Sequence, residues 1–318
     1  MKNKIISILR SENDYISGER ISKKLGISRT AVWKHIKNLK NNGYEIISFT
    51  KKGYKLISEP DNISPNKIKA YLNTSFVAQN IIYNDEVLST NDEAKKNADM
   101  PDGSLFIADV QTAGKGRLGR SWVSPRGTGI WMSLLLKPDI PLSDISQLTL
   151  IAGIAVSRAI GDSTMIKWPN DIVIGTKKVC GILTEMSAET DKINYVVCGI
   201  GINVNTHDFP AELMDKASSI LIETEQNTDR CYLIARVMNE FEPLYKKFIT
   251  DGFSPFRDDY KKSCITLGRD IKVSYHGKEL IGNAVDIDNN GGLIIDTGSK
   301  KVTVTSGEVS VRGIYGYI

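Results

Sequence analysis

Three glycines in the stretch QTAGKGRLGRSW (111–122) constrain the fold of this chain more than any other feature. Their spacing fits G-x-G-x-x-G, a turn that binds a dinucleotide when a strand precedes it and a helix follows at once. An apolar strand precedes them at 104–112, but a proline, two more glycines and a β-branched, aromatic run follow. The glycines therefore join two strands, which excludes a Rossmann turn, and the G-K-[ST] ending of a P-loop is missing.

The loop between these strands carries three cations. Lys115, Arg117 and Arg120 lie among the glycines, whereas dinucleotide turns rely on backbone N–H donors. Glycine lets a loop change shape, and fixed positive charge neutralises carboxylate or phosphate oxygens. We expect a mobile loop that closes over an anionic ligand.

Charge is distributed unevenly along the chain. Residues 1–58 contain 13 Lys and Arg against 4 Asp and Glu, whereas the whole chain has a net charge of only +4. The first segment is therefore strongly basic and the remainder is net acidic. Such asymmetry favours a polyanionic partner for the first segment, because each neutralised phosphate releases counterions.

The basic segment has the pattern of a winged helix-turn-helix. A helix at 17–25 ends at Gly26, and Ser28 can cap a second helix that runs to about residue 41 and is closed by Gly43. Two short β-rich runs around a Lys-Lys-Gly turn follow and predict the wing. We expect this fold to bind DNA, although such a fold can also serve only to stabilise a neighbouring domain. The candidate DNA-binding residues are Ser28, Arg29, Thr30, Lys34, Lys37, Lys51 and Lys52.

A linker is predicted at 58–65 (SEPDNISP), which has two prolines and several turn-forming residues. Beyond it, STNDEAKKNA predicts a helix start, with Ser89 or Thr90 as the cap and Asp92 or Glu93 completing a capping box. The other predicted elements are a helix at 65–72, a strand at 81–83, a core helix at 144–161 and a long core helix at 229–249.

A second polar cluster is predicted around the corner in IKWPNDIVIGTKK. Lys167, Asn170, Asp171 and Lys178 gather where a strand meets a hairpin that turns at 175–177. The apolar strand YVVCGIGINVN follows, and its glycines allow close approach by a ligand. The tail at 268–313 contains five short β-rich runs with Gly and Asn turns, which predicts a small β-barrel.

The sequence shows no signal peptide and no apolar run of the roughly 20 residues that a membrane helix needs, so we expect a cytoplasmic protein with no membrane partner. Its histidines and cysteines are isolated and show no zinc spacing, so no protein-bound metal site is expected.

The motifs STN, QTAGKGRLGRSW, KWPND, KKVCGIL and GIGINVN, in this order behind the basic segment, resemble the bifunctional biotin-protein ligases that also repress the biotin operon. The resemblance covers essentially the whole chain. It implies an α+β protein with three domains: a winged helix-turn-helix at 1–60, a mixed α/β ligase domain like that of class II aminoacyl-tRNA synthetases at 65–265, and an SH3-like barrel at 266–318.

The resemblance implies a reaction in two steps. Biotin and Mg-ATP give biotinyl-5′-AMP and pyrophosphate, and a lysine of a biotin carboxyl carrier protein then attacks the adenylate. The implied catalytic residues are Arg117, Lys178 and Asp171. The implied biotin-binding residues are Ser89, Thr90, Asn91, Gln111, Lys115, Gly116, Arg117 and Lys178. The implied ATP and adenylate residues are Arg117, Arg120, Trp122, Asn170 and Asp171. The chain departs from the usual loop, G-R-G-R-x-G-R, because Lys115 replaces its first arginine and lacks the bidentate fork.

The resemblance also implies regulation. Biotinyl-5′-AMP acts as the corepressor, the adenylate-bound chain forms a homodimer, and two winged domains then bind operator DNA of biotin genes. Residues 207–221 are expected to cover the adenylate. Two alternatives remain open, a ligand-sensing regulator without ligase activity and a lipoate-protein ligase.

Overall fold

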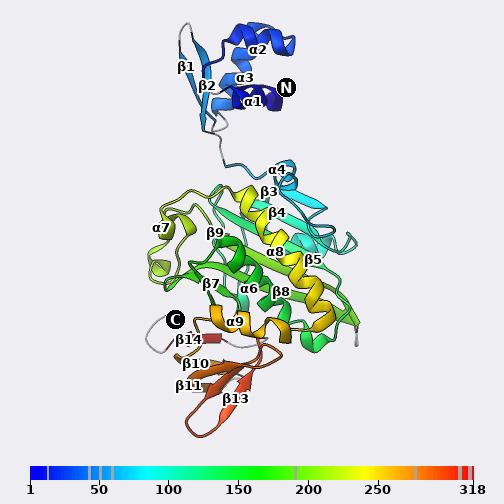
Figure 1. Cartoon of the computed structure of the whole chain (residues 1–318), viewed down its shortest axis with the longest axis vertical. Helices are drawn as coiled ribbons and strands as arrows, with labels where there is room; N and C mark the ends of the chain where they lie inside the picture. Colours follow the sequence, from blue (N-terminus) through cyan, green and yellow to red (C-terminus); the bar gives the residue numbers. More distant parts are fainter. Residues whose placement is uncertain are drawn as a thin grey trace. The chain divides into compact units, whose positions relative to one another are not determined.

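The computed structural model describes residues 1–318 except 13, 42–43, 50–51, 59–60, 190–191, 276–277, 307–309 and 314–316. Lys51, a candidate DNA-binding residue, and Gly43 lie outside the described residues. The chain divides into two compact units, Met1–Asn62 and Ile63–Ile318. Figure 1 shows the elements of both units.

The first unit contains three helices and a hairpin. These are α1 (Lys2–Ser11), α2 (Gly18–Leu25), α3 (Arg29–Asn41), β1 (Glu45–Phe49) and β2 (Gly53–Ser58). The predicted cap of α3 is present, because Ser28 Oγ accepts from Ala31 N at 3.1 Å. Ser17 caps α2 in the same way, since its Oγ accepts from Arg20 N at 3.1 Å. Gly26 ends α2 with a φ of 65°, a conformation that glycine adopts without strain. Its apolar core joins the three helices and β1.

The second unit is built on a seven-stranded sheet with the order β3-β4-β5-β9-β8-β7-β6. Its strands are β3 (Ile81–Val87), β4 (Ser104–Gln111), β5 (Gly129–Leu136), β6 (Thr164–Lys167), β7 (Asp171–Ile174), β8 (Lys177–Glu189) and β9 (Lys192–Asn203). Only β3 and β4 pair in parallel. As predicted, the glycine-rich loop joins two strands, β4 and β5, and among its described residues only a short 3-10 turn, Arg117–Gly119, is helical.

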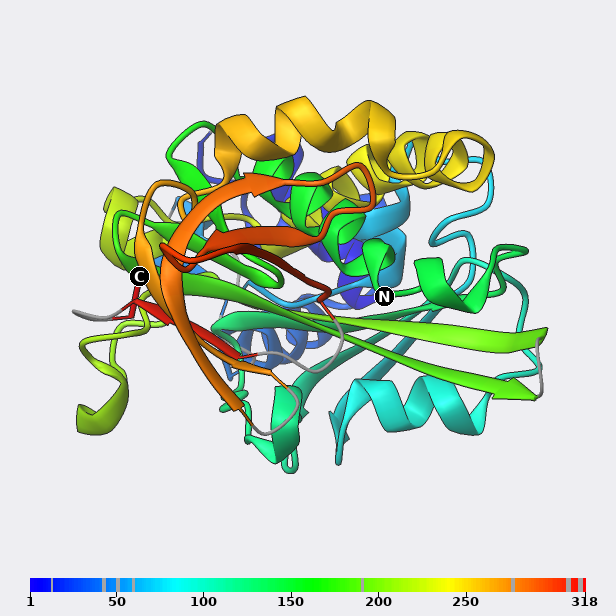
Figure 2. The same ribbon diagram turned by 90° about the horizontal axis from the view of Figure 1, so that it is seen from below.

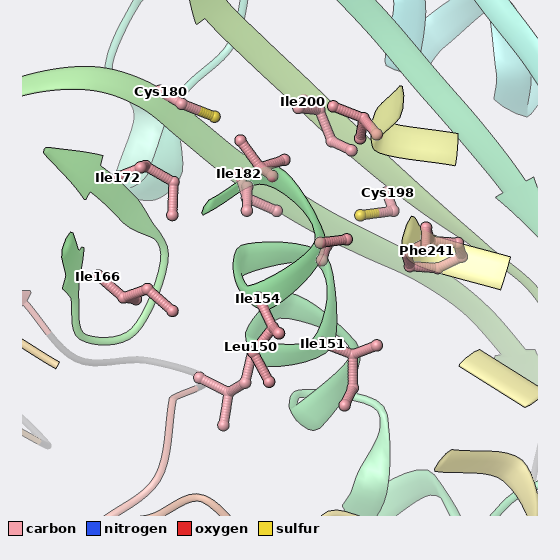
Figure 3. Packing of buried hydrophobic residues seen from close by; sticks show 14 of the residues in the cluster. Leu150, Ile151, Ile154, Ile166, Ile172, Cys180, Ile182, Cys198, Ile200 and Phe241 are labelled. Carbon is pink, nitrogen blue, oxygen red and sulfur yellow. The ribbon is translucent and has the colours of Figure 1, made fainter. Parts of the chain in front are cut away.

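Helices cover both faces of this sheet (Figure 2). The long helices α6 (Gln147–Ile160) and α8 (Arg230–Asp251) pack on one face, and α5 (Thr90–Lys96) packs on the other. Figure 3 shows Ile151 and Ile154 of α6 next to Ile182 of β8 and Cys198 of β9. The alternation of side chains along each strand supplies apolar residues to both faces. The remaining helices are α4 (Pro65–Lys69), α7 (Ile220–Thr224) and α9 (Arg257–Ser263).

A five-stranded antiparallel sheet ends the second unit, with the order β13-β12-β11-β10-β14. Its strands are β10 (Asp270–Tyr275), β11 (Lys278–Ile287), β12 (Leu293–Asp296), β13 (Lys301–Val304) and β14 (Ser310–Gly313). Trp168 anchors it to the corner between β6 and β7, because the buried indole Nε1 donates to the carbonyl of Gly291 at 3.0 Å.

Two local predictions are confirmed only in part, because a helix does begin at Pro65 and α5 does start after Ser89. The helix predicted at 65–72 ends at Lys69. Ser89 does precede α5, but its side chain makes no capping hydrogen bond, and the capping box does not form. The two acidic residues of the expected capping box pair with nearby cations instead: Asp92 with Lys115 at 2.6 Å, and Glu93 with Lys96 at 2.8 Å. None of the described helices is both long and apolar enough to cross a membrane.

Candidate functional site

A pocket of about 450 Å³ lies between the start of α5, the glycine-rich loop and strands β5, β8 and β9. The sequence-predicted residues in its walls are Ser89, Thr90, Asn91, Gln111, Lys115, Gly116, Arg117, Trp122, Asn170 and Lys178. Segments from both ends of the sheet thus meet at one site. The predicted residues Arg120 and Asp171 are not in these walls.

One end of the pocket is neutral and hydrogen-bonded. Gln111 Oε1 accepts from the backbone N–H of Thr90 at 2.8 Å and from its hydroxyl at 3.1 Å, and Gln111 Nε2 donates to Ser124 Oγ at 2.8 Å. Ser89 and Thr90 are almost fully buried. Amide and hydroxyl groups fixed in this way can recognise a neutral polar ring.

Asn91 is held by residues that the sequence analysis missed. Its Oδ1 accepts from Ser133 at 2.6 Å, and its Nδ2 donates to Glu185 at 2.7 Å. Glu185 is itself paired with Lys95 at 2.6 Å. Ser133 and Glu185 lie on strands β5 and β8, and no local motif marks them. Only the order of strands in the sheet brings them beside α5.

The glycine-rich loop places Arg117 at the other end of the pocket. Its guanidinium donates to Asn170 Oδ1 at 2.9 Å and to the carbonyl of Ser306 at 2.8 Å. Burial lowers the pKa of Arg117, and the nearby carboxylate of Asp171 opposes this shift. Lys115 instead holds the loop to α5 through Asp92. Arg117 and Lys115, two of the predicted loop cations, therefore contact different parts of the site.

The loop is strained at the tip. Leu118 has a φ of 56°, in the left-handed region that costs a residue with a Cβ roughly 1 kcal/mol. Its side chain is 60% exposed. Strain of this kind concentrates in segments that change conformation on binding.

Lys178 and Asp171 form a tight ion pair, with Nζ and Oδ1 2.5 Å apart. Burial alone would raise the pKa of Asp171, but the ion pair with Lys178 outweighs it and lowers the pKa. The Lys178 ammonium also lies 4.9 Å from the ring of Trp122. The buried indole Nε1 of Trp122 finds no acceptor among the described residues. This donor is therefore available to a ligand.

The segment 207–221 is hydrogen-bonded to Lys178, which lines the cationic end of the pocket, although none of its own residues is in the pocket walls. Lys178 N donates to the carbonyl of Lys216 at 2.8 Å, and Ser218 N donates back to the carbonyl of Lys178 at 2.9 Å. Asn203, the last residue of β9, donates to the carbonyl of Ser218 at 3.0 Å. The buried hydroxyl of Ser218 has no partner among the described residues. The expectation that 207–221 covers the adenylate stays a prediction, and the sequence did not identify Lys216 or Ser218.

In the first unit, one face of α3 is exposed and cationic. Arg29, Thr30, Lys34 and Lys37 are exposed, while Ser28 uses its hydroxyl as the helix cap. Trp33, which the sequence analysis did not select, is 52% exposed and lies 5.3 Å from the ammonium of Lys37. In the hairpin, Lys52 lies 5.4 Å from the ring of Phe49. An exposed tryptophan among cations can contact bases as well as phosphates.

Among the described residues, no three His, Cys, Asp or Glu side chains gather in a way that could hold a metal ion.

Family models match three parts of the chain. Residues 84–203 match the biotin/lipoate A/B protein ligase family, residues 2–55 match an HTH domain, and residues 266–312 match the biotin protein ligase C terminal domain. The chain belongs to the biotin/lipoate A/B protein ligase family.

Within it, the chain is similar over most of its length to the bifunctional ligase/repressor BirA of Bacillus subtilis, with 44% identity over 91% of this chain and 92% of that protein. It is 32% identical to the biotin--[acetyl-CoA-carboxylase] ligase of Mycobacterium tuberculosis over 68% of this chain and 81% of that protein. The structure of the Aquifex aeolicus biotin protein ligase in complex with biotin and ATP superimposes with a TM-score of 0.67 at 33% identity, covering 74% of this chain and 99% of that chain.

Proposed function

We propose that this protein is a biotin-protein ligase that also represses transcription as a DNA-binding protein. The observation that carries the ligase function is one pocket with a neutral hydrogen-bonding end at Thr90 and Gln111 and a cationic end at Arg117 and Lys178. Biotin has the same polarity, with a neutral ureido ring at one end and a carboxylate at the other. The similarity to ligase/repressors over most of the chain supports both activities.

In the first step, a carboxylate oxygen of biotin attacks the α-phosphorus of Mg-ATP, a new C–O–P linkage forms, and pyrophosphate leaves. Arg117 and Lys178 neutralise the two anions that must approach each other, and Asp171 orients Lys178. In the second step, the amine of an acceptor lysine attacks the acyl carbon and AMP leaves. Positioned cations perform this chemistry without a covalent enzyme nucleophile.

The nucleotide would lie between the hairpin of β7 and β8 and the segment 207–221. Asn170 and the unpartnered indole of Trp122 are assigned to the adenylate, and Arg120 to the phosphates. We add Asn203 and Ser218, because Ser218 has a buried hydroxyl without a partner among the described residues. Magnesium arrives with the triphosphate as part of the substrate.

The first unit is assigned to operator DNA. The exposed face of α3, with Arg29, Thr30, Lys34, Lys37 and Trp33, would enter the major groove, and Lys52 in the hairpin would contact the backbone. The acceptor would be a biotin carboxyl carrier protein, and the location the cytoplasm. We further assign the central domain to the class II synthetase-like fold and the terminal sheet to an SH3-like barrel, with domains at 1–60, 65–265 and 266–318. Biotinyl-5′-AMP would act as corepressor and favour a homodimer.

Mass spectrometry of a biotin carboxyl carrier domain tests the ligase function. After incubation with the protein, ATP, magnesium and biotin, we expect one biotin to be added. Arg117→Ala should slow this about 100-fold or more, the usual loss when one preorganised donor is removed. Arg158→Ala, which removes an exposed arginine of α6, is the matched control.

Biotin binding without any transfer would contradict the ligase function and leave a ligand-sensing regulator. Equal transfer of lipoate in direct competition would contradict the assigned substrate.

A further inference from the structure

Tyr317 lies against two charged residues that face each other across the corner between β6 and β7. Lys167 ends β6, Asp171 begins β7, and the two are directly opposed in the antiparallel ladder. The hydroxyl of Tyr317 donates to Asp171 Oδ2, and its ring centroid is 3.5 Å from Lys167 Nζ. Tyr317, which is far away in the sequence, thus contacts both Lys167 and Asp171.

Directly opposed side chains of opposite charge would ordinarily pair. Here Oδ1 of Asp171 pairs with Lys178, and Oδ2 accepts a hydrogen bond from the hydroxyl of Tyr317. Among the residues that the structure describes, Lys167 makes no ion pair, although its side chain is only 5% exposed. The phenol therefore keeps the Asp171 carboxylate turned away from Lys167. Burial together with the hydrogen bond to Asp171 raises the pKa of Tyr317, so the phenol remains a donor.

Cations outnumber carboxylates around Lys167. Burial lowers the pKa of Lys167 to about 8, Asp171 opposes this shift, and the nearby Lys178, Arg312 and Arg120 add to it. Four cations around one carboxylate form a site for a polyanion. The aromatic face of Tyr317 stabilises the Lys167 ammonium until that anion binds.

We propose that Tyr317 is a positioning residue for the nucleotide phosphates: it holds Asp171 on Lys178 and so leaves Lys167 available to a phosphate oxygen. This inference rests on the proposed ligase function. Neither Tyr317 nor Lys167 lines the pocket assigned to biotin. Loss of Tyr317 therefore weakens ATP binding and use, while biotin binding and transfer from preformed adenylate persist.

The test compares Tyr317→Phe, which keeps the ring, with Tyr317→Leu, which removes both ring and hydroxyl. Tyr232→Phe, on the exposed side of α8, is the matched control. Pyrophosphate release gives kcat and KM for ATP at saturating biotin. Calorimetry gives Kd for biotin alone, and for α,β-methylene-ATP with biotin present, since this analogue cannot release pyrophosphate. Added biotinyl-5′-AMP isolates the transfer step.

We expect Tyr317→Leu to raise the KM for ATP and the Kd of the analogue about tenfold, and Tyr317→Phe to raise them about threefold. Biotin affinity and transfer should stay within twofold of the unchanged protein. Unchanged ATP parameters overturn the inference. A parallel loss of biotin affinity and transfer also overturns the inference, because it would indicate general destabilisation. A gain in ATP use overturns it as well, because Tyr317 would then block the nucleotide.

Measurements on the unchanged protein distinguish a failure of this inference from a failure of the proposed ligase function. If it binds the analogue but releases no pyrophosphate from ATP, the ligase function fails, while a tenfold weaker Kd in Tyr317→Leu still supports the positioning role. If it releases pyrophosphate and the variants match it, only the positioning role fails.

Discussion

At the scale of single residues, close packing around Gly199 fixes the neutral end of the pocket. A Cβ at Gly199 would lie 2.2 Å from Oδ1 of Asn91, which is held in place by Ser133 and Glu185. Asn91 could yield only by breaking these two hydrogen bonds. Gly199 therefore matters for close approach of side chains rather than for an unusual backbone conformation.

We expect Gly199→Ala to weaken biotin binding at least tenfold, measured by calorimetry. Gly153→Ala is the matched control, because a Cβ on that glycine of α6 would meet its nearest neighbour at 3.9 Å, an ordinary contact. Alanine in a helix interior should stabilise the control by up to about 1 kcal/mol. Biotin affinity that is unchanged in Gly199→Ala would show that Asn91 does not shape the site.

Single residues also show which parts of the site could be predicted from the sequence and which could not. Arg117 and Lys178 were selected because they lie in recognisable motifs, and both line the pocket. Tyr317 and Glu185 lie in no motif, and their partners are at least 90 positions away in the sequence. The strand order of the sheet brings Glu185 to its partners, and the segment that follows β14 brings Tyr317 to Asp171.

At the scale of elements, Glu242 of α8 anchors the segment before β3. Its carboxylate accepts from the backbone N–H groups of Ser75, Phe76 and Val77 at 2.9 to 3.0 Å and from Lys246 at 2.7 Å. Burial opposes its ionisation, but these donors lower the pKa of Glu242 from 4.5 to about 2. The ionised carboxylate thus joins α8 to a loop more than 160 residues away.

Because the pKa of Glu242 is lower in the folded than in the unfolded protein, this stabilisation is present above about pH 4.5 and is lost as pH falls towards 2. We expect Glu242→Gln to lower the free energy of unfolding by about 2 kcal/mol at pH 7. Urea unfolding should show this difference shrinking between pH 5 and pH 3. If the difference in free energy of unfolding between Glu242→Gln and the unchanged protein stays constant across that range, the loss of stability comes from packing and not from the ionised carboxylate.

Helix α3 provides a second test at this scale, because Trp33 is the only tryptophan in residues 1–62. If this face binds DNA, operator DNA should quench Trp33 fluorescence in a Trp122→Phe, Trp131→Phe, Trp168→Phe background that still folds by circular dichroism and still binds biotinyl-5′-AMP. Lys37→Ala should reduce the slope of log affinity against log salt by about 1. Emission that stays unchanged while DNA binds would place the contact elsewhere.

Elements differ in how well the sequence predicts them. Helices α2 and α3 of the first unit follow from caps, a terminal glycine and apolar spacing, all of which are local signals, whereas α1 was not predicted. Ser89 occupies the N-cap position of α5 as predicted, but the acids of the expected capping box pair with Lys115 and Lys96 instead. Local patterns identify the element and its start, whereas charge pairs such as Lys115–Asp92 decide the side-chain contacts at that start.

At the scale of the whole molecule, the sheet leaves one edge uncovered. Strand β8 runs to Glu189, but β7 pairs only with its first residues, Lys177–Gly181. Beyond that point, β8 has no strand on this side among the described residues, and Met186 is 52% exposed. A groove open to solvent lies between this edge and the glycine-rich loop, with Leu118, Ile145 and Met186 in its walls. The loop and the edge are therefore neighbours.

This arrangement gives the proposed homodimer a physical cause. A ligand shifts an association equilibrium only through contacts that its bound form makes. If the adenylate draws Arg117 inward, the strained turn at Leu118 moves beside the β8 edge, which can then pair with the same edge of a second copy. Biotin with ATP, unlike biotin alone, should therefore raise the dimer fraction strongly in sedimentation velocity.

Met186→Lys tests this edge, because it would place like charges near each other across a symmetric pair of strands. We expect it to abolish the ligand-induced dimer while biotin transfer, which needs only the pocket of one copy, continues. Lys192→Glu, at the far end of the same hairpin, is the control for an added charge change. A dimer fraction unaffected by adenylate in the unchanged protein would contradict the coupling, and a dimer that persists in Met186→Lys would exclude this edge as its interface.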